Sequence, residues 1–316
     1  MDEVKQKLGG EIRYTPKLDV IFQTLFREVG NEKVTKKFVE SILEEKFEKI
    51  DLSKNQILRS ESIEDKMGIL DVVIELEGKI NCDVEMQVVE KEDLIERLLF
   101  YWSKMYIKGI KKGEEYSTLK RTIVILIADF EVKSIKELEY HTKWKLIEEK
   151  ERKVILTDKL EIHIIELPKL KGREEEQGEL LDWLFFISNP SSERVKKRME
   201  ENEELKEAKE RLEKINQDEK MQRIAELRDK AIRDEKSAYS TGFNRGIKDG
   251  KEQGIAQGRE EGWKEGREEG KQEGREQRNK EIAIKLLKRN MSIEEIQKIT
   301  DIPKEEIQKL KEEDKE

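Results

Sequence analysis

The N-terminal part of the chain carries apolar side chains at the spacing of amphipathic helices. Between positions 18 and 29, Leu, Ile, Phe and Val recur every three to four residues, which places them on one helix face. Thr15-Pro16 predicts the start of this helix, with Thr as N-cap and Pro at the first helical position, and Gly30-Asn31 predicts its end. A second helix is expected over roughly 33 to 46. The chain therefore opens with two helices.

The apolar period then changes from 3.6 to 2, which is the spacing of a β-strand. Residues 69–76 and 80–88 alternate between polar and apolar positions, and Glu77-Gly78-Lys79 between them is a short turn. The two segments predict a β-hairpin. The polar face of its second strand carries Asn81, Asp83, Glu85 and Gln87.

Further apolar patterns follow the hairpin. They predict a helix, a strand, a short helix, two more strands and a short apolar helix, at about 92–110, 122–128, 134–140, 143–149, 159–167 and 180–187. Helices and strands thus alternate through this part of the chain. This order predicts a mixed α/β domain in which helices pack on a sheet.

Composition divides the chain into parts. Because 44% of the residues are charged and only 35% are apolar, a core requires the apolar residues to be concentrated, and most of the aromatics lie before position 190. We therefore expect an α/β domain over residues 1–190. The charged remainder is divided into a helix or coiled coil at 191–240, a glycine-repeat helical linker at 241–280 and a small helical module at 281–316.

The linker carries a glycine at every fourth position from Gly242 to Gly274. Each glycine costs about 1 kcal/mol relative to alanine in a helix interior, so a lone helix here is weak. Either the segment is a helix on whose glycines another chain packs closely, or it is a flexible linker. We favour the helical linker over the flexible one. In the last module, Ser292-Ile-Glu-Glu295 is a capping box. Self-association through this helical tail fits better than DNA docking, because the last helix carries two acids in its first turn.

Charge, cysteine content and apolar runs bear on the partners and the cellular location of the protein. The net charge of -8 mildly opposes nucleic-acid binding, although a metal ion and a local basic groove act independently of the overall balance. Cys82 is the single cysteine, so no disulfide forms within the chain. No apolar run approaches the ~20 residues of a membrane span, and the N-terminus lacks the apolar core of a signal peptide. These features predict a cytoplasmic protein without a membrane segment.

The hairpin carries the candidate chemistry. If the turn is centred on Gly78, Asp71 lies opposite Glu85 and both side chains project from one face, with Gln87 next along it. Opposed carboxylates repel each other, and a divalent cation held by oxygen ligands reverses the sign of that interaction. The alternative is that these acids line a solvated sheet face. Flanking apolar residues favour the metal hypothesis, because buried acids are costly unless they are paired or bound to metal.

These residues resemble a known family. Gly68-Ile-Leu-Asp71 and Val84-Glu-Met-Gln87 look like the motif of PD-(D/E)XK nucleases, and more closely that of the Rpn family of recombination-promoting nucleases and putative transposases. The resemblance extends to the helix at 17–26, to the helix at 96–106 and to the glycine-repeat tail. It implies a restriction-endonuclease-like mixed sheet flanked by helices, followed by a long charged helical tail. It also implies an Mg²⁺-dependent DNA endonuclease linked to recombination, transposition or mobile-element defence.

The resemblance assigns roles to individual residues. It implies that Asp71 and Glu85 coordinate Mg²⁺ and that Gln87 orients the attacking water. The sequence departs from the usual pattern twice: Leu70 stands where a Pro often precedes the Asp, and Gln87 replaces the usual Lys. A glutamine carries no charge and cannot act as a base. The alternative function is therefore a catalytically weak DNA-binding or oligomerising protein with a degenerate nuclease fold.

Three further residues are candidates for the site. Asp19 matches an acid on the first helix of these folds and is a candidate catalytic residue, although an acid in a first helical turn also favours the helix dipole. Arg97 and Tyr101 lie one helical turn apart and are candidates for substrate binding, with an interface packing pair as the equal alternative. His141 and His163 show no ligand spacing, so surface or core roles are expected for them.

Overall fold

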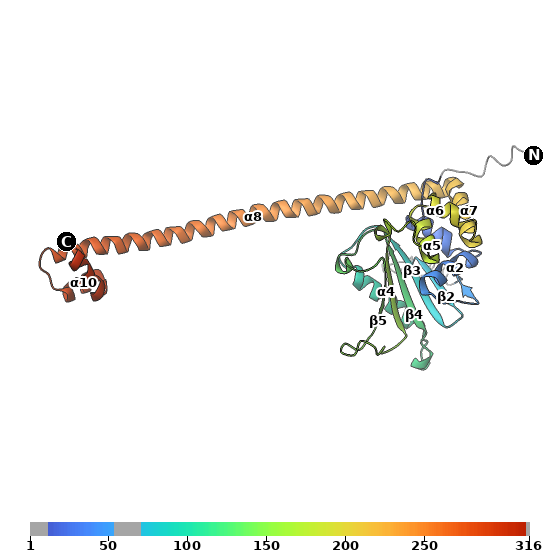
Figure 1. The fold of residues 1–316 in the computed structure, drawn as a ribbon, viewed down its shortest axis with the longest axis horizontal. Helices are drawn as coiled ribbons and strands as arrows, with labels where there is room; N and C mark the ends of the chain where they lie inside the picture. The colour runs from blue at the N-terminus through green and yellow to red at the C-terminus, as the bar shows by residue number, and fades with distance from the viewer. Residues whose placement is uncertain (1–11, 54–70, 314–316) are drawn as a thin grey trace, which may run out of the picture. The chain divides into compact units, whose positions relative to one another are not determined.

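The structure, a computed structural model, describes residues 12–53 and 71–313 (Figure 1). The chain divides into two compact units, Met1–Ser237 and Ala238–Glu316. The first contains the α/β fold, and each unit is described by itself.

A six-stranded mixed sheet forms the centre of the first unit in the described part of the chain, with the order β1-β2-β3-β4-β6-β5. β3 pairs with β4 and β4 with β6 in parallel, whereas the outer pairs are antiparallel. The strands are β1 (Ile50–Asp51), β2 (Val72–Leu76), β3 (Ile80–Gln87), β4 (Arg121–Ala128), β5 (His141–Lys145) and β6 (Leu160–Glu166). The expected hairpin is therefore β2–β3, and it lies beside the parallel centre of the sheet.

Helices cover both faces of this sheet. On one face, α1 (Asp19–Arg27), α2 (Glu32–Leu43) and α5 (Glu179–Ser188) share a large apolar core with β3 and β4. On the other face, α4 (Leu94–Lys108) packs on alternate residues of β4 and β6. The mixed sheet flanked by helices agrees with the expected α/β fold of the restriction-endonuclease type (Figure 1).

The structure corrects some expected boundaries. Thr15-Pro16 does not start a helix: the Leu18 N–H donates to the Thr15 carbonyl in a turn, and α1 begins at Asp19. Proline is well suited to the second position of such a turn, because its φ angle is fixed. The short helix expected at 134–140 is a single 3₁₀ turn, Lys133–Ile135. A two-residue strand such as β1 is too short to produce a periodic pattern.

The first unit continues well past residue 190. The segment expected to be one charged helix or a coiled coil contains α6 (Glu193–Arg198), α7 (Glu203–Gln217) and the start of α8 (Glu219–Leu287). Val195 and Leu212 on these helices are fully buried in the main core. Charged residues dominate the composition here and obscure the few apolar residues that attach these helices to the α/β fold.

The second unit contains the rest of α8, followed by α9 (Ile293–Thr300) and α10 (Lys304–Glu313). The capping box at Ser292 and Glu295 is present, with both reciprocal hydrogen bonds. Ala283, Ile296 and Ile307 form a small core of their own. Within the described ranges, no helix has the length and apolar character needed to cross a membrane.

Candidate active site

The two hairpin acids meet at the end of the β2–β3 ladder. The pairing of Leu76 with Ile80 and of Val72 with Val84 confirms the register that the turn predicts. Asp71 directly precedes β2, and its backbone N–H donates to Glu85 Oε1 at 3.2 Å. In return, Asp71 Oδ2 accepts a hydrogen bond of 2.9 Å from the backbone N–H of Met86.

Both carboxylates are buried, as expected from their flanking apolar residues. Asp71 is 7% exposed and Glu85 is 1% exposed. Burial raises the pKa of each carboxyl well above its usual range, and the neighbouring acids raise both pKa values further. In the absence of a cation, this pair therefore retains protons at a pH at which ordinary carboxyls have lost them.

A third acid belongs to this group and was not among the expected site residues. Asp83 is fully buried, and burial raises its pKa to about 8. Among the described residues, neither of its carboxylate oxygens has a hydrogen bond of ordinary geometry, although Glu85 and the backbone of Val72 lie close enough to influence its pKa. The sequence did contain a signal, because Asp83 shares the polar face of β3 with Glu85.

Two glutamines contact the acid pair. Gln87 Nε2 donates to Glu85 Oε2 at 3.3 Å, which agrees with its expected place beside this acid. Gln23 Nε2, from α1, donates to Asp71 Oδ1 at 2.7 Å. Gln23 was missed, because a polar residue on an amphipathic helix resembles many solvated ones. Each amide fixes the orientation of one carboxylate.

The structure brings the expected site residues together. A cavity of about 390 Å³, which we call the acid pocket, is lined by residues from α1, β3, α4 and the start of α8. Its walls include every residue that the sequence singled out for the site, namely Asp19, Asp71, Glu85, Gln87, Arg97 and Tyr101.

Arg97 and Tyr101 form a pair on one wall of the acid pocket. Arg97 Nη2 donates to the Tyr101 hydroxyl at 2.8 Å, and the guanidinium carbon lies 5.7 Å from the ring centroid. Tyr101 is 5% exposed, and burial raises the pKa of its hydroxyl. The tyrosine thus anchors a cation at the edge of an acidic cavity.

Comparison with known families identifies the family of the chain. Residues 16–242 match the PD-(D/E)XK nuclease family transposases. The chain belongs to this family. The match includes the acid pocket and the start of α8, and it agrees with the resemblance found in the sequence. No curated protein and no solved structure matches the chain.

The donor set of this family member fits a hard divalent cation. In the part of the chain that the structure describes, no three acid, histidine or cysteine side chains are grouped to enclose a metal ion. Mg²⁺ does not require such a cage, because it binds through one or two carboxylates and completes its octahedron with water and substrate phosphates. Asp71 and Glu85 supply two adjacent carboxylates whose repulsion a cation relieves.

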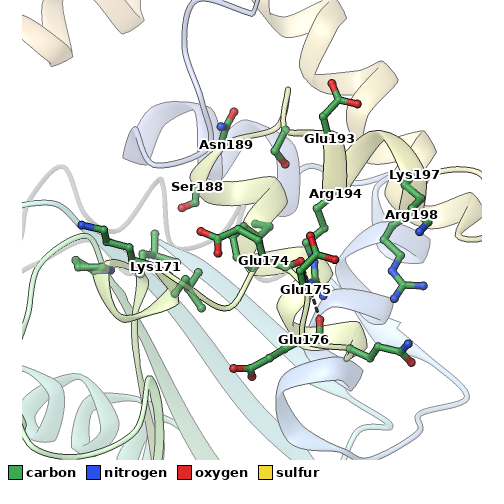
Figure 2. A pocket seen from close by; sticks show the side chains of 16 residues that line it. Lys171, Glu174, Glu175, Glu176, Ser188, Asn189, Glu193, Arg194, Lys197 and Arg198 are labelled. Carbon is green, nitrogen blue, oxygen red and sulfur yellow. Dashed lines mark hydrogen bonds between the residues drawn. The ribbon is translucent and has the colours of Figure 1, made fainter.

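A larger cavity lies elsewhere and lacks this chemistry. It measures about 670 Å³ and lies around Arg194 and the segment 174–177 (Figure 2). Arg194 donates to Asp182 at 2.7 Å and to the backbone carbonyl of Glu174 at 2.7 Å. Arg194 therefore holds the loop at 174–177 in place. The described residues that line this cavity include no pair of opposed buried acids like Asp71 and Glu85.

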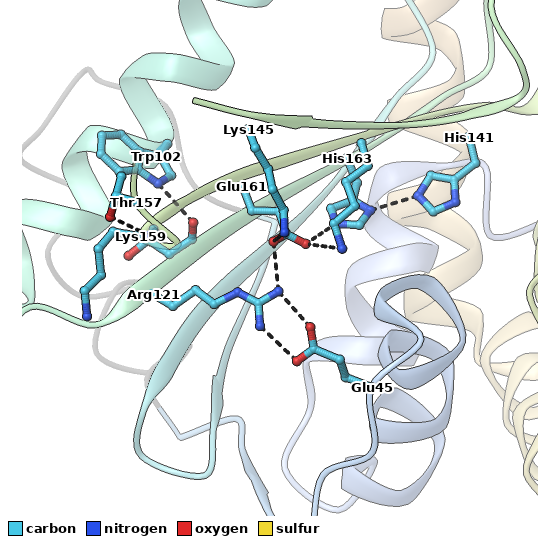
Figure 3. A network of polar contacts seen from close by, with 11 residues as sticks. Glu45, Trp102, Arg121, His141, Lys145, Thr157, Lys159, Glu161 and His163 are labelled. Carbon is cyan, nitrogen blue, oxygen red and sulfur yellow. Dashed lines mark hydrogen bonds and ion pairs between the residues drawn. The ribbon is translucent and has the colours of Figure 1, made fainter. Parts of the chain in front are cut away.

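The sequence positions of the two histidines suggested that they are isolated, but the structure places them in one hydrogen-bonded network (Figure 3). His141 Nε2 lies 2.8 Å from His163 Nδ1, and His163 Nε2 lies 2.8 Å from Glu161 Oε1. Arg121 also bridges Glu161 to Glu45. The antiparallel pairing of β5 with β6 brings His141 and His163 together, although they are 22 residues apart. The network links side chains of β4, β5 and β6, and none of these side chains lines the acid pocket.

Proposed function

We propose that this protein is an Mg²⁺-dependent DNA endonuclease that hydrolyses phosphodiester bonds. The observation that carries the proposal is the buried, opposed pair Asp71 and Glu85 at one end of the hairpin. Membership in a nuclease family of transposases supports DNA as the substrate and links the activity to recombination, transposition or mobile-element defence.

The residues of the acid pocket divide the work of such a reaction. Asp71 and Glu85 would hold the ion, which when bound lowers the pKa of a water and stabilises charge on a phosphoryl oxygen. Gln87 fixes the Glu85 carboxylate and orients water without acting as a base. Arg97, anchored by Tyr101, binds the DNA backbone. Asp19, on the wall formed by α1, is a further candidate catalytic residue of the pocket.

A plasmid nicking assay tests this proposal. Wild-type protein is expected to nick plasmid in Mg²⁺ and to stop when EDTA is added. Asp71→Asn and Glu85→Gln are expected to lower the rate about 100-fold or more, because losing even an outer partner of a metal ligand costs about 10- to 100-fold. Both substitutions remove the charge of a buried carboxyl group but keep the size and shape of the side chain, so both variants should stay folded.

Glu77→Gln is the matched control, since Glu77 lies on the exposed turn of the same hairpin. It should nick like wild type. Undiminished cleavage in Asp71→Asn and Glu85→Gln would contradict the site assignment. DNA binding without metal-dependent nicking in wild type would instead favour the alternative, a catalytically weak DNA-binding protein.

We also propose that the chain forms a homo-oligomer through its C-terminal helical tail. Phe243, Ile247, Ile255 and Trp263 each follow a glycine of the repeat, and each is more than half exposed in the described chain. This stripe turns by about 40° around α8 with each four-residue step. A second helix that winds along the stripe would gain contact surface from the apolar residues and room for close approach from the glycines.

A further inference from the structure

The first turns of α8 form a wall of the acid pocket. Arg228, Ile232 and Glu235 line the same cavity as Asp71 and Glu85. Their spacing of four and three residues places them on one helix face. Ile232 is 6% exposed and belongs to the main core, so this face is fixed toward the α/β fold. The helix that leads into the glycine repeat therefore begins as part of the candidate active site.

Arg228 extends from this wall to the acid on α1. Its Nε donates to Asp19 Oδ2 at 2.7 Å, and its Nη2 lies 2.6 Å from the same oxygen. The other oxygen, Asp19 Oδ1, accepts the backbone N–H of Val20 at 2.8 Å. Asp19 thus fixes one edge of the guanidinium. Among the described residues no acceptor contacts Arg228 Nη1, and the side chain is 43% exposed.

The other cations of the acid pocket have different partners, and Arg97 keeps the role in binding the DNA backbone that is proposed above. Lys91 pairs with Glu235 at 3.2 Å, and Arg97 donates to the Tyr101 hydroxyl. Arg27 is 5% exposed. Arg228 combines a fixed position, remaining N–H donors and partial exposure, and its charge also acts on Asp71. A DNA phosphate that enters this acid-lined cavity needs such a cation, and a guanidinium presents paired donors to phosphate oxygens.

We infer that Arg228 binds the DNA phosphate at the acid pocket and that Asp19 positions its guanidinium for this contact. The inference rests on the proposed nuclease function and names one of its substrate-binding residues. It makes α8 a part of the active site as well as the start of the tail. It also gives Asp19 a role that does not require it to touch the metal ion.

Binding and cleavage by arginine variants test this inference. Arg228→Gln is expected to weaken binding of a fluorescent DNA duplex about 10-fold or more, because a hydrogen bond to a charged group is lost. The slope of log affinity against log salt should fall by about 1. Arg228→Lys retains the charge and should lie between Arg228→Gln and wild type. Binding in Mg²⁺ is measured in the Glu85→Gln background, where cleavage is blocked, and KM and kcat are measured with active protein.

Two arginines on the same helix serve as controls. Arg223 and Arg233 form ion pairs with Glu226 and Asp229 along α8, and both are largely exposed. Arg223→Gln and Arg233→Gln should leave the KM for DNA unchanged. Asp19→Asn should raise KM and should add little to the effect of Arg228→Gln, since both act through one guanidinium. Melting curves identify any variant that fails to fold.

Three outcomes would overturn the inference. Arg228→Gln could match the Arg233→Gln control in affinity and KM, which would leave the nuclease proposal standing and remove Arg228 from substrate binding. Arg228→Gln could instead nick faster than wild type, which would show that the Asp19–Arg228 pair closes the acid pocket. A wild-type protein that neither binds nor cuts DNA would overturn the proposed function itself, and this inference with it.

Discussion

At the residue scale, the side-chain amides of two glutamines hold the carboxylates of the acid pair in position. Gln23 and Gln87 each donate one N–H to a different buried acid, Asp71 and Glu85. These bonds oppose the pKa increase that burial causes. Under the proposed function, the lone pairs that these hydrogen bonds leave on each carboxylate are the ones that bind the cation.

Removing either amide should weaken metal use without removing a ligand. We expect Gln23→Ala and Gln87→Ala each to raise the Mg²⁺ concentration for half-maximal nicking about 10-fold or more, as for other partners of metal-binding side chains. Gln272→Ala, on the exposed part of α8, should behave like wild type. A titration of nicking rate against Mg²⁺ measures this. Unchanged half-maximal concentrations would show that the carboxylates do not depend on the amides.

His141 gives a prediction about pH. Burial, together with the charges of His163 and Lys143, lowers its pKa from 6.5 to about 4 in the folded chain. The unfolded chain therefore binds more protons between pH 4 and 6.5, and stability falls as the pH decreases through this window. His141→Gln should reduce that dependence by up to about 1.4 kcal/mol per pH unit. Urea unfolding at several pH values measures it, and identical slopes for variant and wild type would contradict it.

At the element scale, the sequence predicts best what is local. The β2–β3 hairpin was predictable with its register, because the turn around Gly78 fixes which residues face each other. The role of α7 was not predictable in this way. Its apolar residues are few among many charges, and only packing against α1 and α2 shows that they belong to the core.

Leu212 on α7 tests whether this helix belongs to the folded unit. It is fully buried, whereas Leu227 on α8 is 52% exposed. We expect Leu212→Ala to lower the free energy of unfolding by about 2–5 kcal/mol, because it leaves a cavity in the main core. Leu227→Ala should change it by less than about 0.5 kcal/mol. Equal effects of the two variants in urea unfolding would mean that α7 contributes little to the fold.

At the scale of the whole molecule, the hairpin acids could be found from sequence but the far wall of their pocket could not. Asp71 and Glu85 belong to one local pattern. Arg228 contacts Asp19 across 209 positions of the chain, inside a helix in which nearly every second residue is basic or acidic. Only the packing of α8 on the core singles out one arginine from its neighbours.

The glycine repeat leads to a prediction about assembly. A methyl group added at Gly250, Gly258 or Gly266 would meet no atom within 4 Å in the described chain. Changing all three to Ala should raise helix stability by about 1 kcal/mol each. If a second chain packs closely on the glycines, the same change should lower the proportion of oligomer. Circular dichroism and sedimentation measure the two effects.

Gln253→Ala and Gln257→Ala are matched controls, because they add no volume at the glycine positions. They should leave assembly unchanged. An oligomer that tolerates all three Gly→Ala changes would show that the chains do not approach each other along the glycines.

The long sequence separation between Asp19 and Arg228 also sets the timing of function during synthesis. The pair spans 209 positions, so a ribosome needs roughly 10 to 40 s to add the arginine after the aspartate, at about 5–20 residues per second. A growing chain that already contains both hairpin acids still lacks this wall of the pocket. Under the proposed nuclease function, a cell that makes the protein in this order is exposed to the completed pocket only when most of the chain has been made.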